Sequence, residues 1–300
     1  MDNALAFLEQ HPAPRHSVFD EEVQYRAKFQ SFGKVPGELT VQRISFERDV
    51  DRYRRAAENG SHSAFPVRRA RNPDRVPDLE SLERSQRRAK TKVRLLVTEL
   101  APTSLVTFTT RKVYPLDALV KVWEAFVRIA RQVDPDFKYV CVPEPHPSNP
   151  DHLHLHAAVR TKQLKRDTLR RLWHIALEGF EGRRVTATLR GSAAPGNIDD
   201  QPIKGRDTLK RIRKIARYIS KYITKEMLER FNRRRYWPSK GINLADAQVF
   251  WLHSVSQAEA IAEACRAFGV WDGIGPSFKA FRPSDRVFWM PFQVEHEPPF

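Results

Sequence analysis

A run of alternating residues near the middle of the chain constrains its fold more than any other feature. Histidines occupy positions 152, 154 and 156, Leu153 and Leu155 stand between them, and apolar residues continue to Val159. In a β-strand, side chains two residues apart lie on the same face. The pattern therefore predicts a strand over residues 152–159, with the leucines in a core and the histidines together on the opposite face.

The segments around this strand predict an α+β fold with a central, mainly antiparallel sheet of about five strands and flanking helices. Expected strands are rich in β-branched and aromatic residues, and expected helices have apolar residues at three- and four-residue spacing. The turn-forming run 146–151 should join two strands as a hairpin. The other expected strands are 104–110, 139–142 and 184–189, and the expected helices are 78–100, 116–131, 167–177, 206–229 and 257–268. A Gly/Pro linker is expected at 191–196.

Apolar residues make up 41% of the 300 residues, enough for a full-sized core. Residues 1–80 are proline-rich and charged with little periodicity, and we interpret them as an N-terminal extension of uncertain order. Residues 81–240 contain the chemically distinctive motifs and are predicted to form the main domain. Residues 241–300 are interpreted as a C-terminal extension, partly helical and irregular in its proline-rich end.

The net charge of +16 favours a partner with a phosphate backbone, because such an excess of cations attracts nucleic acid and accelerates association. The alternative is a basic surface that only keeps the protein soluble. Trp237 could stack on a base, or it could simply anchor a loop. The candidate DNA-binding residues are Arg84, Arg87, Arg88, Lys210, Arg211, Lys214, Arg217, Arg234, Arg235 and Trp237.

The sequence predicts a cytoplasmic protein without a membrane partner. It contains no apolar run long enough to span a bilayer, and residues 1–3 lack the character of a signal peptide. The two cysteines, Cys141 and Cys265, are too few for a disulfide framework or a Cys-rich zinc site. We expect both to be core residues.

The histidine strand is a candidate metal site, because two imidazoles on one strand face can bind the same cation. His154 and His156 are preferred, since the strand continues beyond them, whereas His152 lies nearest the turn and is the alternative. Glu144 on the other arm of the hairpin is the candidate third ligand, although a turn carboxylate could equally have no role. Two histidines and a carboxylate suit Mn²⁺, Zn²⁺, Ni²⁺ or Co²⁺, and Mg²⁺ only with several waters.

Tyr218 and Tyr222 are four residues apart on an expected helix, and each is followed three residues later by a lysine, Lys221 or Lys225. This spacing places both phenols on one helix face, at the border of an apolar stripe. They could be ordinary amphipathic tyrosines. Alternatively, they are nucleophiles whose phenolate a cation stabilises. A phosphotyrosine conserves the energy of a phosphodiester, which is useful when a cut strand must be rejoined.

Three motifs together resemble those of the HUH endonucleases, specifically the two-tyrosine rolling-circle replication initiators of bacterial single-stranded DNA phages and plasmids. Residues 105–109 look like the first strand motif, His154-Leu155-His156 like the histidine-hydrophobic-histidine motif, and residues 218–222 like the Y-x-x-K-Y helix. The resemblance covers about residues 85–240. The additional His152 departs from the pattern.

The resemblance implies a five-stranded antiparallel sheet and a divalent metal, Mn²⁺ or Mg²⁺, held by two histidines and Glu144. It also implies cleavage of single-stranded origin DNA in a bacterial cytoplasm, through a 5′-phosphotyrosine that leaves a 3′-OH primer and is later resolved by rejoining. The sequence has no G-x-x-x-x-G-K-[ST] motif, so we expect no ATP site and a host helicase and replication machinery as partners. Alternatives are a transposase with the same chemistry and a non-catalytic basic repressor.

Overall fold

The computed structural model contains two compact units, residues 76–244 and residues 1–75 with 245–300. Each unit has its own five-stranded sheet. The structure describes the following residues: 24–44, 79–183, 191–203, 208–223, 236–252, 254, 256–268, 281–284 and 287–291.

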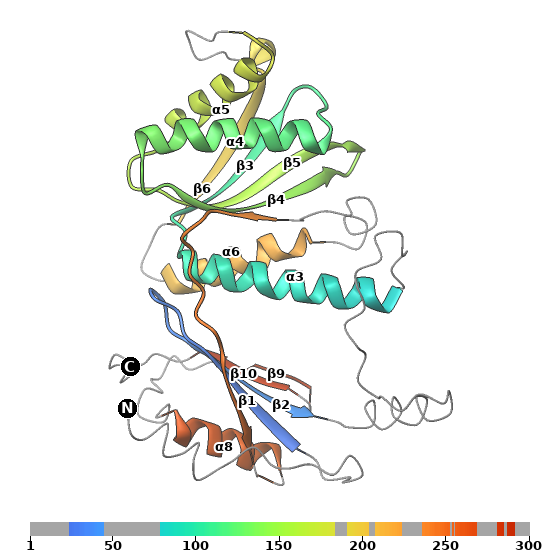
Figure 1. The fold of residues 1–300 in the computed structure, drawn as a ribbon, viewed down its shortest axis with the longest axis vertical. Helices are drawn as coiled ribbons and strands as arrows, with labels where there is room; N and C mark the ends of the chain where they lie inside the picture. The colour runs from blue at the N-terminus through green and yellow to red at the C-terminus, as the bar shows by residue number, and fades with distance from the viewer. Residues whose placement is uncertain are drawn as a thin grey trace, which may run out of the picture. The chain divides into compact units, whose positions relative to one another are not determined.

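The sheet of unit 76–244 is antiparallel throughout, as the sequence predicted. The histidine strand lies at its centre, with two strands on either side (Figure 1). The strand order is β6 (Gly196–Pro202), β3 (Ser104–Thr110), β5 (Asn149–Arg160), β4 (Lys138–His146) and β7 (Trp237–Pro238).

Helices cover both faces of this sheet (Figure 1). On one face lie α4 (Leu116–Val133) and α5 (Arg166–Phe180), whose apolar sides pack on Leu153 and Leu155. On the other face lie α3 (Leu79–Leu100) and α6 (Thr208–Lys221), which share a second apolar cluster with the sheet. The alternation of β5 is thus confirmed, because its leucines enter one core while the histidines face the side of α6.

The hairpin that carries the histidines is longer and tighter than predicted. Strand β4 continues through His146, β5 begins at Asn149, and only two residues form the turn. The sequence did not predict this because Pro143 and Pro145 weaken a strand pattern. Beyond Cys141, however, β4 pairs on one side only, so both prolines lie where the missing N–H removes no ladder bond. Glu144 is therefore a strand residue and not a turn residue.

Two further expectations need correction. The expected linker 191–196 ends in strand β6, which pairs with β3 along its whole length. Helix α6 was expected to continue to residue 229, but it ends at Lys221, where Tyr222 and Ile223 donate to carbonyls three residues back and tighten the last turn. The expected strand 184–189 lies outside the described residues.

The two ends of the chain meet in the second unit. Its sheet has the order β8 (Gln248–Leu252), β1 (Gln24–Gln30), β2 (Glu38–Ile44), β10 (Val287–Pro291) and β9 (Phe281–Ser284). Helix α8 (Gln257–Ala267) has a capping box at Ser256 and packs on the apolar cluster of this sheet. Segments that we interpreted as separate extensions, including the C-terminal end that we expected to be irregular, therefore contribute strands to one structure.

Both cysteines are free and buried, in agreement with their predicted place in the core. Cys141 lies in β4 and Cys265 in α8. Among the described helices, none has the length and apolar character needed to cross a membrane.

Candidate functional site

Three adjacent strands bring the predicted metal ligands together. In the register of the hairpin, Glu144 on β4 stands directly opposite His154 on β5. His156, two residues further along β5, is paired with Thr107 on β3. All four side chains belong to the face of the sheet that α6 covers, because they alternate with residues of the opposite core. The antiparallel register therefore places a carboxylate and two imidazoles next to one another.

His156 is held from both ring nitrogens. Its Nε2 donates to Oε2 of Glu144 at 2.5 Å, and its Nδ1 is 3.1 Å from the hydroxyl of Thr107. The ring is buried, with 5% of the residue exposed. A hydroxyl can donate or accept, so Thr107 can hold the same ring orientation in either tautomer. Nε2 consequently always faces Glu144.

The other histidines differ in their partners. Nε2 of His152 donates to the carbonyl oxygen of Thr110 at 2.8 Å and is 3.1 Å from its hydroxyl, so this ring is tied to the end of β3. His146 accepts the backbone N–H of Ser148 at Nδ1. The ring of His154 lies between them, with centroids 5.0 Å from His146 and 5.6 Å from His152. Of the predicted ligands, His152 thus has the most evident structural role.

Both tyrosines lie against His156. The ring of Tyr222 stacks on the imidazole at a centroid distance of 4.1 Å and an interplanar angle of 6°. Tyr218 meets Tyr222 edge to face at 5.2 Å and lies 6.4 Å from His156. Tyr218 is 40% exposed, whereas Tyr222 is half-buried. Although Tyr222 lies one residue beyond α6, the two phenols face the same imidazole.

Burial keeps the histidines of this site uncharged. It lowers the pKa of His156 to about 4, and burial together with three neighbouring histidines lowers the pKa of His154 to about 4. Burial raises the pKa of Glu144, an effect that the nearby His146 partly offsets. Burial, a hydrogen bond with Tyr218 and the charge of Glu144 raise the pKa of Tyr222. At neutral pH both imidazoles are therefore neutral, the form that binds metal.

The donor set fits a divalent cation in its chemistry and orientation. Two neutral imidazoles and one carboxylate suit a borderline or hard cation, and Thr107 supplies the outer hydrogen bond that typically fixes a metal-binding histidine. In the part of the chain that the structure describes, no three His, Cys, Asp or Glu side chains close around one point. Instead, the hydrogen bond between His156 and Glu144 joins two atoms that a cation would share.

The predicted cations have different positions. Lys221 is exposed in the last turn of α6, and Lys225 lies outside the described residues. Trp237 is half-buried in β7 and packs against the core, which matches the anchoring role considered for it. Seven candidate DNA-binding residues are exposed on α3 and α6: Arg84, Arg87, Arg88, Lys210, Arg211, Lys214 and Arg217. Arg234 and Arg235 lie outside the described residues.

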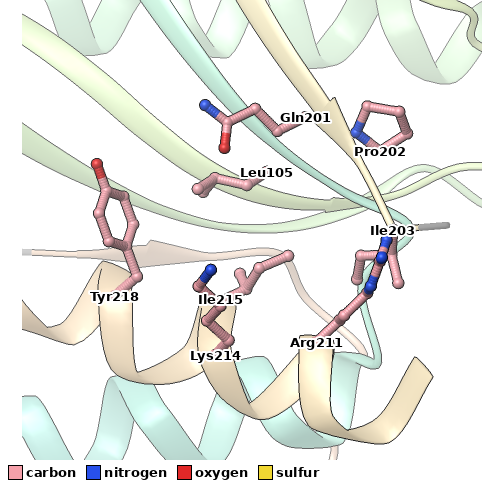
Figure 2. Close-up of a pocket in the computed structure, with 8 residues that line it drawn as sticks. All are labelled: Leu105, Gln201, Pro202, Ile203, Arg211, Lys214, Ile215 and Tyr218. Atoms are coloured by element: carbon pink, nitrogen blue, oxygen red, sulfur yellow. The ribbon is translucent and has the colours of Figure 1, made fainter. Parts of the chain in front are cut away.

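A pocket beside Tyr218 was not predicted from the sequence. It has a volume of about 400 Å³ and lies between α6 and the strands β3 and β6, as Figure 2 shows. No sequence signal marks it, because β6 itself was not predicted. Its lining residues are Leu105, Gln201, Pro202, Ile203, Arg211, Lys214, Ile215 and Tyr218.

Residues 103–227 match the model of a family of replication-associated proteins, the ORF2 family. The matched segment begins just before β3 and ends after Tyr222, so it contains every strand and side chain of the site. No curated protein and no solved structure matches the chain. The match supports a role in the initiation of replication.

Proposed function

We propose that the chain is a rolling-circle replication initiator that nicks single-stranded origin DNA through a covalent phosphotyrosine and later rejoins the displaced strand. The observation that carries this proposal is the convergence of Tyr218 and Tyr222 on one imidazole, His156, which is itself bonded to Glu144. Two hydroxyl nucleophiles beside one potential cation site suit a cycle of cleavage and transfer. The family match favours replication over transposition, which would use the same chemistry.

In the proposed reaction, one tyrosine oxygen attacks the phosphorus of a phosphodiester. The bond from phosphorus to the 3′ oxygen breaks, the phenol loses its proton, and the 3′ oxygen gains one. The products are a 5′-phosphotyrosine and a 3′-OH that primes synthesis. Rejoining reverses these changes when a 3′-OH attacks the phosphotyrosine. A divalent cation on His154, His156 and Glu144, Mn²⁺ or Mg²⁺, would neutralise charge on the phosphate and polarise it.

The residues of the chain divide the other tasks. Thr107 and Glu144 fix the ring of His156. The arginines and lysines exposed on α3 and α6 attract the DNA backbone. Tyr218, which is more exposed than Tyr222, is assigned the first attack, and Tyr222 the transfer that follows. Because the sequence has no G-x-x-x-x-G-K-[ST] motif, unwinding is assigned to a host helicase in the bacterial cytoplasm.

The test is covalent capture of labelled DNA. The full chain is incubated with randomised single-stranded DNA labelled at its 3′ end, in Mn²⁺ or in EDTA, and denaturing gels detect the label on the protein. A label that attaches in Mn²⁺ and not in EDTA supports the proposal. Binding without any adduct would indicate a non-catalytic DNA-binding protein such as a repressor. Tyr114→Phe is the matched control, because Tyr114 donates to Glu181, away from the site.

Glu144→Ala tests the third ligand. If the carboxylate binds the cation, the metal concentration needed for half-maximal adduct formation should rise by roughly 10- to 100-fold, a range borrowed from losses of outer-shell partners as a lower bound. DNA binding in EDTA should remain unchanged. An unchanged metal requirement would remove Glu144 from the ligand set and leave His146 and His152 as candidates.

A further inference from the structure

We infer that the pocket beside Tyr218 binds one unstacked base of single-stranded DNA and thereby selects the sequence next to the cut. This inference rests on the proposed function and specifies its substrate. The pocket has a volume of about 400 Å³, within the range of roughly 300–1,000 Å³ that is usual for small-molecule sites. It is therefore large enough to hold more than a water cluster or an ion.

The lining has the chemistry that a nucleotide requires. Leu105, Pro202 and Ile215 provide apolar surface for the faces of a flat ring. The two charged residues of the lining, Arg211 and Lys214, are both cationic and lie one turn apart on α6. Apolar surface beside two cations suits a base attached to a phosphate, and it disfavours a purely apolar ligand or a cation.

Gln201 gives the pocket a group that can read a base. Its side chain belongs to β6 and lies above α6 in Figure 2. Its Nε2 donates to Oδ2 of Asp199 at 2.9 Å, which fixes the direction of the amide. A side-chain amide has a carbonyl acceptor and a second N–H donor, the pair of groups that recognises the edge of a base.

The position of the pocket determines which base it binds. Tyr218 lines the pocket and also meets Tyr222 at the histidine site, so a phosphate attacked by Tyr218 is next to the pocket opening. A base in the pocket must then belong to a nucleotide adjacent to the scissile phosphate. Cleavage would therefore prefer one base at one position beside the cut.

Two variants at Gln201 test the inference, and the residue is exposed, so neither change should disturb the core. Adducts formed with randomised single-stranded DNA in Mn²⁺ are sequenced to give the base preference at each position from the cut. Affinity for the same DNA is measured in EDTA by fluorescence anisotropy, independently of cleavage. Gln201→Ala should reduce the preference at one adjacent position by at least roughly fivefold. Gln201→Trp should fill the pocket and weaken binding by roughly 5- to 100-fold.

Charge-matched variants provide the control. Lys214→Ala removes a cation from the pocket, whereas Arg217→Ala removes one from the same helix outside the lining. Only Lys214→Ala should lower the preference for the adjacent base. A wild-type chain that forms adducts with no base preference, or Gln201 variants that behave like Arg217→Ala, would overturn the inference. A wild-type chain that forms no adduct would instead overturn the proposed function.

Discussion

The two faces of the central sheet use the same strands for different purposes. On the side of α4 and α5, Phe108 meets Trp123, Phe126 and Trp173 edge to face at 5.0–5.2 Å, and this core is closed. On the side of α3 and α6, an apolar cluster occupies one part, and the histidines, Glu144 and both tyrosines occupy another. Neighbouring residues on one strand can therefore differ completely in role. Stability and chemistry should be separable by mutation.

The largest expected effect is that of removing both phenol oxygens. The double variant Tyr218→Phe with Tyr222→Phe should bind single-stranded DNA normally and form no adduct, because the rings and their packing remain while the nucleophiles are gone. Each single variant should still cleave, with the adduct on the remaining tyrosine, and should fail in strand transfer. Denaturing gels and anisotropy provide the two readouts. A tyrosine that can be removed without effect on transfer would reduce the site to one nucleophile.

A pair of adjacent residues on β5 compares the two faces directly. His156→Ala should abolish adduct formation while DNA binding persists, since phosphate affinity comes from dispersed cations. Leu155→Ala, on the opposite face and fully buried, should instead lower the free energy of unfolding by about 2–5 kcal/mol. Denaturant unfolding and covalent capture measure the two effects. Equal loss of DNA binding and cleavage in His156→Ala would show that this imidazole is structural.

A second pair, on β3, sharpens the comparison. Phe108→Ala should cost about 3–5 kcal/mol of unfolding free energy, because it empties the centre of the aromatic core. Thr107→Ala removes the hydroxyl beside Nδ1 of His156 and should raise the metal requirement by roughly 10- to 100-fold. Its effect on unfolding should be much smaller. A metal requirement that Thr107→Ala leaves unchanged would mean that the hydroxyl does not orient the imidazole.

The smallest expected effect concerns the acid stability of the closed face. Asp134 follows α4 and is buried, which raises its pKa, but hydrogen bonds from Thr161 and from the backbone of Lys162 and Gln163 outweigh burial and lower the pKa below its ordinary value. The folded state therefore favours the ionised form. Its contribution is present above the unfolded pKa of about 3.9 and is lost as the pH falls through the lower folded value.

Asp134→Asn should thus lower the unfolding free energy at neutral pH by about 1–3 kcal/mol. The difference from the wild type should shrink below about pH 4. Denaturant unfolding from about pH 7 to about pH 3 measures it. A difference that stays constant over this range would show that ionisation of Asp134 is not involved. Adduct formation at neutral pH should not change, since Asp134 belongs to the other face.

The sequence predicted the elements whose patterns are local. Strand β3 and the apolar side of α4 follow directly from their periodicity, and the alternation of β5 predicted which side chains share a face. Strand β6 carries one buried apolar side chain, Ile198, between polar residues, so its pattern is that of a loop. It exists because β3 pairs with it and because Gly196 approaches β3 so closely that a Cβ would lie 2.3 Å from the carbonyl oxygen of Thr109.

The same reasoning explains what else the sequence could not predict. The second sheet pairs β1 with β8 and β2 with β10, strands that are more than two hundred residues apart in the chain, and no local pattern specifies such partners. In the candidate site, the spacing predicted that the tyrosines would lie together and that the histidines would share a face. It did not predict that Tyr222 stacks on His156 or that Thr107 bonds to the same ring, because these contacts depend on how α6 packs across the sheet.

The most direct test of the central claim is to locate the adduct in the wild-type chain. Protein that has reacted with single-stranded DNA in Mn²⁺ is digested with nuclease and protease, and mass spectrometry identifies the peptide that carries a 5′-linked nucleotide. We expect the modification on Tyr218, with a smaller share on Tyr222, because Tyr218 is the more exposed phenol. An adduct on any other tyrosine, or cleaved DNA with no protein attached, would contradict the account.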